Sequence, residues 1–228
     1  MTCKESLSKF FEIDSSKVDY YYEEFSKFSS YLKKTFKQDK SLSMQEAFAL
    51  YLVSTLYDVK HVAEIGVRYG ISTRFWLAAL PGCAVTGYDL KKLYNKRKKL
   101  KPIKSPNFNF IQGDVNKTWR ESKYDLIFYD AHPYDLTYKL ATEMKDKVKI
   151  HCFHDVGSLC FKKESSNIPR EERIEIDVAG HWERHVMAEV FTPCIKDEIF
   201  AVNDEWRSII IDDKYGVGIT INNSLIGN

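Results

Sequence analysis

Short apolar runs alternate with helix-length segments through the middle of the chain, and this alternation restricts the fold more than any other feature. Each run is followed by a glycine, an acidic residue or a histidine, which marks the point where a strand ends. Strands that are separated by helices form a parallel sheet, because each connection must return the chain to the same end of the sheet. The runs are residues 61–65, 84–88, 108–112, 124–129 and 148–153.

The last part of the chain departs from this alternation. Residues 206–211 and 217–221 are mostly apolar, and between them stands Asp-Asp-Lys-Tyr-Gly, a pattern typical of a β-hairpin. We therefore predict an α/β fold. It is a Rossmann-like, doubly wound sheet that is mostly parallel, is closed by a C-terminal antiparallel hairpin and is preceded by N-terminal helices.

The first 40 residues are rich in Lys, Glu, Ser and aromatic residues, and the aromatic ones recur at roughly helical spacing. This predicts one or two helices that cover the main domain or a partner subunit. Next comes Ser43-Met-Gln-Glu46, a capping box that predicts a helix over residues 44–57. We divide the chain into a helical extension, 1–43, and a main domain, 44–228. A homodimer through the extension is one explanation of its aromatic residues, and core packing explains them equally well.

Composition excludes several classes of protein. Hydrophobic residues make up 44% of the 228 residues and charged residues 29%, which is typical of a soluble globular domain. The net charge of +2 gives no argument for nucleic acid or a membrane surface as a partner, and no apolar run approaches the length of a membrane span. The N-terminus lacks a signal-peptide pattern, and the five cysteines fit no disulfide or zinc framework. We therefore expect a cytoplasmic protein.

Two charged patterns have a functional and a structural interpretation. Residues 91–104 contain eight Lys or Arg residues, and residues 91–101 have the character of a basic helix. Such a run can attract RNA or phosphorylated ligands, but we favour a solvated helix face. His181, His185 and Glu189 are spaced to share one face of a helix. For them we favour an amphipathic surface over a metal site.

The first strand leads into residues 64–70, Glu-x-Gly-x-x-x-Gly, which we interpret as a cofactor loop. Glycine lets the backbone turn tightly and approach a ligand, and the N-terminus of the next helix favours a carboxylate. A dinucleotide loop would carry a second glycine where this chain has Arg68. Asp89, which ends the second strand, is placed to accept from both ribose hydroxyls of an adenosine. Asp114, which ends the third strand, is placed to contact the adenine.

The segments EIGVRYGIST, GYDL, FIQGDV and YDLIFYDAHPY, in this order and spacing, resemble the class I S-adenosylmethionine (SAM)-dependent methyltransferases. The resemblance covers roughly residues 44–222, and the terminal hairpin resembles the closing strands of that family. It implies SAM as the cofactor. The implied contacts are Glu64, Gly66 and Gly70 for the methionine part, Asp89 for the ribose and Asp114 for the adenine.

Acidic and histidine residues also pair at two further strand ends, where parallel sheets bind ligands. Asp130 precedes His132, and His154 precedes Asp155. This resembles the O-methyltransferases of the catechol type and related sugar and macrolide enzymes. In those, an Asp after the fourth strand and an Asp-Asn after the fifth hold a divalent metal. The resemblance implies Asp130 and Asp155 as ligands of Mg²⁺ or Mn²⁺, while Val156 stands at the Asn position and leaves the third ligand missing.

A histidine could supply the third ligand, and imidazole would shift the preference from Mg²⁺ toward Mn²⁺, Fe²⁺ or Zn²⁺. Without a metal, His132 or His154 could remove the acceptor's proton as a general base. We therefore expect Asp130, His132 and His154 to be catalytic. The expected reaction is methyl transfer to a hydroxyl of a small molecule, such as a sugar, a nucleotide-sugar or a natural product. Residues 156–180 would form a lid or a wall of the acceptor pocket.

Two other functions are compatible with the same residues. One is an enzyme of this fold with a different reaction, in which the His and Asp residues at the strand ends hold iron. The other is a non-catalytic Rossmann-like binding or assembly module that uses the N-terminal helices as its interface. Titration with SAM and with NAD would separate the binding module from the enzymes.

Overall fold

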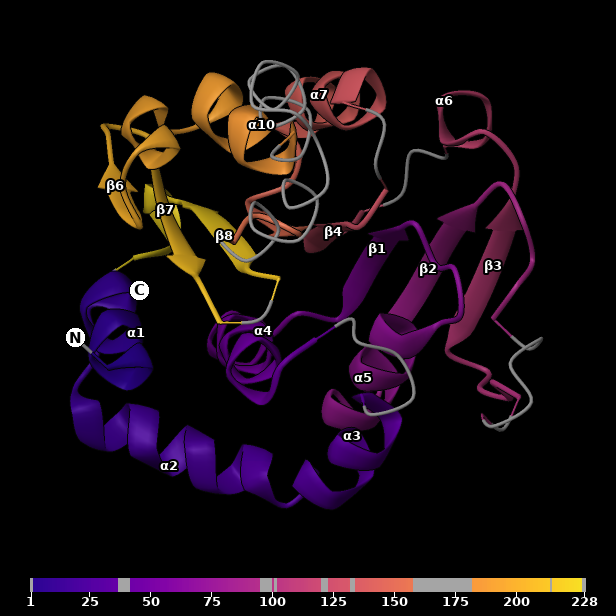
Figure 1. Ribbon diagram of the computed structural model, residues 1–228, viewed down its shortest axis with the longest axis horizontal. Coiled ribbons are helices and arrows are strands. Elements are labelled where there is room, and N and C mark those ends of the chain that lie inside the picture. The colour runs from indigo at the N-terminus through magenta and orange to yellow at the C-terminus, as the bar shows by residue number, and fades with distance from the viewer. Residues whose placement is uncertain are drawn as a thin grey trace, which may run out of the picture.

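In the computed structural model, one mixed sheet runs through the molecule (Figure 1). The structure describes residues 2–36, 42–94, 100, 102–119, 123–131, 134–157, 182–213 and 215–226. Within these ranges eight strands pair in the order β3-β2-β1-β4-β5-β8-β7-β6. They are β1 (His61–Ile65), β2 (Ala84–Asp89), β3 (Phe108–Gln112), β4 (Leu126–Tyr129), β5 (Ile150–His154), β6 (Phe200–Val202), β7 (Trp206–Ile211) and β8 (Val217–Asn222).

Strands β1 to β5 are parallel, and the direction in which the chain adds strands reverses after β3. The chain moves outward from β1 to β2 and β3, and then crosses to β4 on the other side of β1. In open α/β sheets, ligands bind at the carboxyl ends of the strands that flank such a reversal. β8 pairs antiparallel with β5 and β7, and β6 pairs antiparallel with β7. This confirms the predicted doubly wound, mostly parallel sheet with a C-terminal hairpin.

The predicted strands agree with the observed ones to within two residues at each end. β1 and β3 have the predicted bounds, whereas β4 and β5 each begin two residues later. Before β5, the backbone N–H groups of Lys147 and Val148 both donate to the carbonyl of Met144, so the chain is still leaving the preceding helix. The three-residue strand β6 is not indicated by the sequence, because so short a segment shows no period.

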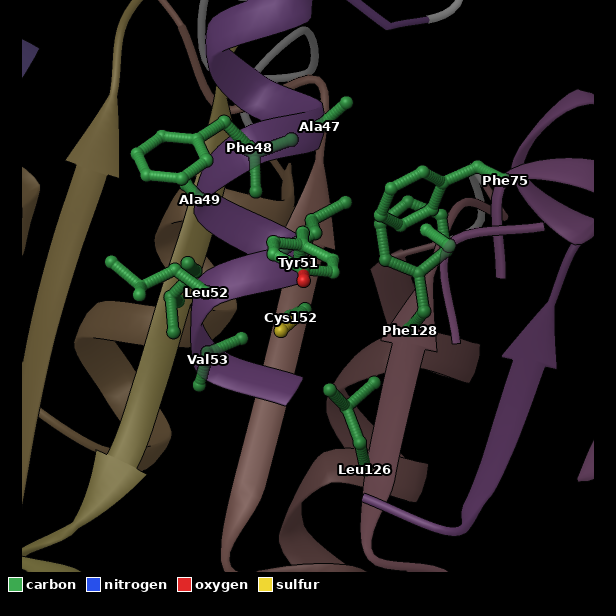
Figure 2. Close-up of a cluster of buried hydrophobic side chains, with 14 of the residues drawn as sticks. Ala47, Phe48, Ala49, Tyr51, Leu52, Val53, Phe75, Leu126, Phe128 and Cys152 are labelled. Carbon is green, nitrogen blue, oxygen red and sulfur yellow. The ribbon is translucent and has the colours of Figure 1, made fainter. Parts of the chain in front are cut away.

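Helices cover both faces of the sheet. α4 (Met44–Leu56) and α5 (Ile71–Ala79) pack on one face, and α7 (Tyr134–Met144) and α10 (Trp182–Val190) pack on the other (Figure 1). Figure 2 shows side chains of α4 close to Cys152 of β5, with Leu126 and Phe128 of β4 alongside. Every residue of β4 and β5 is buried, which explains their continuous apolar runs. Shorter helices are α6 (Val115–Thr118), η2 (Pro193–Lys196) and η3 (Asn223–Leu225).

The N-terminal extension forms three helices, where the sequence predicts one or two. They are α1 (Cys3–Phe11), α2 (Ser15–Ser26) and α3 (Ser29–Phe36). Glu12 ends α1 in a left-handed conformation, and Asp14 caps the start of α2. Leu7, Phe10 and Phe25 are buried in the core cluster that also contains α4, so the extension shares its core with the main domain. Dimerisation through these helices stays a prediction.

The helix predicted over residues 44–57 is confirmed as α4, but the basic helix predicted over residues 91–101 is wrong at its beginning. Residues 91–94 are not helical. Asp89 accepts the backbone N–H of Lys91 at 2.9 Å, and Tyr94 is buried against Phe108 of β3. These contacts bring the chain back to the sheet edge. Residues 95–99 and 101 lie outside the described ranges. Among the helices that are described, none is both long enough and apolar enough to cross a lipid bilayer.

Arg207 of β7 holds α1 against the sheet. Its guanidinium donates to the carbonyl of Phe10 at 3.0 Å and to Glu12 at 2.7 Å, and its side chain is largely buried. Arg207→Ala should therefore lower the free energy of unfolding by about 2 kcal/mol, as expected for hydrogen bonds that involve a charged group. Denaturant titration measures the change. Lys60→Ala, which removes an exposed ion pair with Asp58, is the control, and an equal loss in both variants would contradict this role for Arg207.

Candidate active site

The loop between β1 and α5 is a tight turn with three residues in the left-handed region. Gly66 has a φ of 95°, Arg68 of 45° and Gly70 of 70°. A side chain on Gly66 would place its Cβ 2.2 Å from the carbonyl oxygen of Asp130, so only glycine fits there. Gly70 is the N-cap of α5 and makes no side-chain cap. In the first turn of α5 the N–H of Thr73 donates to the buried Glu64 carboxylate, while Gly70 offers no side chain to the N–H groups before it.

The residues predicted for the ribose and the adenine lie beside this loop, at the carboxyl ends of β2 and β3. Asp89 accepts the backbone N–H of Arg68 at 2.6 Å and that of Lys91 at 2.9 Å. Asp114 caps α6 by accepting the N–H of Asn116 at 3.0 Å. The structure thus brings both aspartates to the same carboxyl-terminal end of the sheet as the loop. A ligand at that edge would share their carboxylates with these backbone donors.

Glu64, the third acidic residue of the predicted cofactor site, lies beneath the loop. Its side chain has no exposed surface, and its carboxylate accepts from the hydroxyls of Ser72 and Thr73 in the first turn of α5. Burial raises the pKa of Glu64 to about 8, although both hydroxyls act in the opposite direction. Glu64 therefore fixes the start of α5, and it would influence a cofactor only through the loop above it.

Asp130, His154 and Asp155 meet at the carboxyl ends of β4 and β5. The Nδ1 atom of His154 lies 3.1 Å from an oxygen of Asp130 and 3.1 Å from an oxygen of Asp155. Burial lowers the pKa of His154, but the two carboxylates outweigh it and hold that pKa well above its ordinary value. Asp155 has a φ of 60°, which is unusual for a residue other than glycine. The cluster is thus a buried imidazole held between two partly exposed carboxylates, which favour its charged form.

The sequence places Tyr215 only in the hairpin turn, but the structure sets its ring beside this cluster. The rings of Tyr215 and His154 have centroids 6.1 Å apart. The turn reaches the cluster because β8 pairs antiparallel with β5, with Val217 opposite His154. This antiparallel pairing is the signal that could have indicated Tyr215, since a turn that precedes β8 must lie at the carboxyl end of β5.

Three predicted features fall outside the described residues. They are His132, His181 and all but the first two residues of the segment 156–180, which the sequence predicts as a lid or pocket wall. His132 therefore stays a predicted catalytic residue. The lid likewise stays a prediction.

The histidine and acidic residues of α10 do not form a metal site among the residues that are described. Glu189 accepts the hydroxyl of Tyr134 at 2.5 Å, and Val186, on the same helix, is fully buried. This agrees with the amphipathic helix favoured from the sequence. Within the described part of the chain, the group of three side chains that could hold a metal ion is that of Asp130, His154 and Asp155.

Solved structures of methyltransferases share this fold. A Staphylococcus aureus protein assigned as a caffeoyl-CoA O-methyltransferase matches with a TM-score of 0.56 and 13% identity, over 85% of this chain and 91% of its own. A Podospora anserina methyltransferase with bound S-adenosylhomocysteine (SAH) gives 0.52 and 14%, over 87% of each chain. The O-methyltransferase TomG of Streptomyces achromogenes, in complex with SAM, gives 0.50 and 15%, over 88% and 89%. The fold is therefore that of the class I SAM-dependent methyltransferases.

Comparison of the whole sequence with families and with curated proteins finds no relative. No protein-family model matches it, and no curated protein is significantly similar to it. At identities of 13–15% the structural likeness establishes the fold.

Glu64 should make the stability of the protein depend on pH. Its pKa is about 8 in the folded protein against an ordinary value of 4.5. Between these values the unfolded chain ionises while the folded protein keeps its proton, so the free energy of unfolding should fall as the pH rises through this window. Glu64→Gln cannot ionise and should lose less stability over the same window. Urea titration measures both slopes, with the exposed Glu143→Gln as control, and equal slopes for Glu64→Gln and wild type would contradict the assignment.

Proposed function

We propose that the protein transfers a methyl group from SAM to a hydroxyl of a small molecule. One contact carries the proposal: the Gly66 turn of the cofactor loop packs on the backbone of Asp130. The N–H of Asp130 donates to the carbonyl of Ile65 at 2.8 Å, and Gly66 has no room for a side chain on that side. A cofactor on the loop would have its reactive end near Asp130. Methyl transfer requires this closeness of donor and activated acceptor.

For the cofactor, we infer that Gly66 and Gly70 border the methionine part, Asp89 the ribose and Asp114 the adenine. Glu64 would act from beneath the loop. The support is that all these residues lie at the carboxyl ends of β1, β2 and β3, beside the reversal of strand order. The N-terminus of α5, where Gly70 offers no capping side chain, suits the carboxylate of an amino-acid ligand.

A divalent cation fits the cluster at Asp130. Two carboxylates and one imidazole offer three ligand atoms within 4.8 Å of one another. Val156, at the position of the expected Asn ligand, is fully buried and has no donor atom, so His154 would complete the set with Asp130 and Asp155. This mixture of nitrogen and oxygen ligands suits Mn²⁺, Fe²⁺ or Zn²⁺ better than Mg²⁺. When bound, such a cation lowers the pKa of a coordinated hydroxyl.

His154 sets the pH at which the cluster works. Because Asp130 and Asp155 hold its pKa well above the ordinary value, both ring nitrogens of its imidazole are protonated at neutral pH. His154 must lose one of these protons before it can take a proton from the substrate hydroxyl or bind a cation. Methyl transfer should therefore become faster as the pH rises above neutrality. The acceptors that we favour are sugars, nucleotide-sugars and natural products, whose hydroxyls need such help to lose a proton.

Asp130→Asn should lower the rate of SAH formation by at least about 10²-fold, the usual contribution of a group that handles the reacting proton. Its affinity for SAM should stay unchanged, because the hydrogen bond and the close approach between Asp130 and the loop involve the backbone of Asp130, which the substitution keeps. SAH formation with a panel of hydroxylated sugars and natural products measures the first effect, and isothermal titration with SAM measures the second. Exposed Asp135→Asn is the control. Full turnover in Asp130→Asn would show that the Asp130 carboxylate is not needed for methyl transfer. A wild-type protein that does not bind SAM would overturn the proposed function.

The cluster should bind Mn²⁺ with an affinity that increases with pH, because His154 has to lose its proton first. Asp155→Asn should weaken binding by about tenfold or more, since it removes a charged ligand. Asparagine tolerates the left-handed backbone at this position, so the loop should keep its shape. Electron paramagnetic resonance of free Mn²⁺ measures the affinity, with exposed Asp146→Asn as the control. If wild type and Asp155→Asn bind Mn²⁺ equally, Asp155 is not a ligand.

A further inference from the structure

Glu46 of α4 is a fully buried carboxylate that belongs to none of the methyltransferase-like segments. It is the third residue of the helix, and its Oε2 atom accepts the N–H of Ser43 at 2.7 Å as part of the predicted capping box. Taking a carboxylate out of water is costly unless hydrogen bonds replace the lost solvent. The capping box occupies only one of its two oxygens. The cost of burying Glu46 therefore depends on the hydrogen-bond partners of the other oxygen.

The second oxygen of Glu46 binds a distant part of the chain. Oε1 accepts the N–H of Tyr215 at 3.1 Å and that of Gly216 at 2.8 Å, 169 and 170 residues further along. Burial raises the pKa of Glu46, and the backbone hydrogen bonds from Ser43, Tyr215 and Gly216 act in the opposite direction by favouring its charged form. Glu46 thus joins the N-terminus of α4 to the turn between β7 and β8.

That turn is in direct backbone contact with the loop that follows β5. The N–H of Gly157 donates to the carbonyl of Tyr215 at 2.7 Å, and the N–H of Val156 donates to that of Gly216 at 3.4 Å. A Cβ on Gly216 would lie 2.2 Å from the nitrogen of Gly157, so the two segments meet without side chains between them. The position of the turn therefore fixes the position of residues 156 and 157.

The loop held in this way begins with Asp155, whose carboxylate reaches His154 at 3.1 Å. Asp155 has a φ of 60°, a conformation that persists in a residue with a side chain only when its surroundings hold it. Tyr215, whose N–H binds Glu46, presents its ring to His154 at 6.1 Å. Glu46 is thus connected to two neighbours of the imidazole, to Tyr215 on the turn and, through the loop after β5, to Asp155.

We propose that Glu46 is a positioning residue for the cluster of Asp130, His154 and Asp155. It acts by spanning the distance between the helix cap and the β7–β8 turn, and the loop after β5 takes its shape from that turn. This inference rests on the proposed function only in that the cluster is taken as the reactive centre.

The test compares four variants of the full chain. Glu46→Ala removes both sets of hydrogen bonds, and Glu46→Asp keeps the charge but is one methylene too short to reach both partners. Glu46→Gln keeps the length and one acceptor oxygen for the turn. Ser43→Ala breaks only the hydrogen bond from the N–H of Glu46 to the Ser43 hydroxyl, and it serves as the matched control for a weakened helix cap. The readout is the Nδ1–H signal of His154 in protein labelled with ¹⁵N-histidine, assigned with His154→Gln.

Hydrogen bonds to Asp130 and Asp155 protect this proton from exchange with water. Glu46→Ala and Glu46→Asp should speed its exchange by at least about tenfold, which corresponds to the loss of about one charge-assisted hydrogen bond. Glu46→Gln and Ser43→Ala should stay within about twofold of wild type. If Glu46→Ala does not fold, Glu46→Asp decides. Exchange that is unchanged in Glu46→Asp, or raised equally in Ser43→Ala, would overturn the proposal and leave Glu46 as a helix cap.

This outcome is independent of the proposed reaction, because the exchange of the His154 proton requires neither SAM nor an acceptor. Failure of the proposed function would instead appear in the wild-type protein, as absence of SAM binding or of SAH formation. With an acceptor in hand, Glu46→Asp should lower kcat by on the order of 10²-fold, as small displacements of reacting groups do. The KM for SAM should stay unchanged, because the loop at Gly66 and Gly70 makes no hydrogen bond to Glu46 within the described residues. A change in KM alone would contradict a positioning role.

Discussion

The backbone contact between the Gly66 turn and Asp130 is the constraint on which the rest of the site depends. The N–H of Gly66 donates to the carbonyl of Tyr88, and the N–H of Asp130 donates to that of Ile65, so the carboxyl ends of β2, β1 and β4 are tied together. No side chain separates the loop from the strand end. The candidate cofactor loop and the candidate reactive cluster are therefore held at a fixed separation by the central strands of the sheet.

Two histidines of β5 show how strongly the neighbours of a buried group control its charge. His151 is fully buried between the Tyr129 hydroxyl and the carbonyl of Val148, and burial lowers its pKa to about 3. His154 is almost as buried, yet its pKa lies well above the ordinary value because the carboxylates of Asp130 and Asp155 face it. On the same strand, burial thus favours the neutral form of one imidazole, and neighbouring carboxylates favour the charged form of the other. Perturbed groups of the second kind are typical of functional sites.

Much of the fold could be predicted because its elements depend on local patterns. The apolar runs of β4 and β5 follow from burial on both faces of the sheet, and the start of α4 follows from the capping box of Ser43 and Glu46. Prediction fails where a tertiary contact opposes the local preference. Residues 91–94 begin a basic stretch that predicts a helix, but Tyr94 packs on Phe108 of β3 instead.

The sequence by itself determined that acidic residues end successive parallel strands, so Asp89, Asp114, Asp130 and Asp155 had to share one edge of the sheet. It also determined that a glycine-bearing loop opens at that edge. Only the tertiary structure decided which of these groups touch: that Nδ1 of His154 lies between two carboxylates, and that Glu46 reaches a turn 170 residues away. The physical reason is that hydrogen bonds over such separations depend on how helices and strands pack together, which no local pattern encodes.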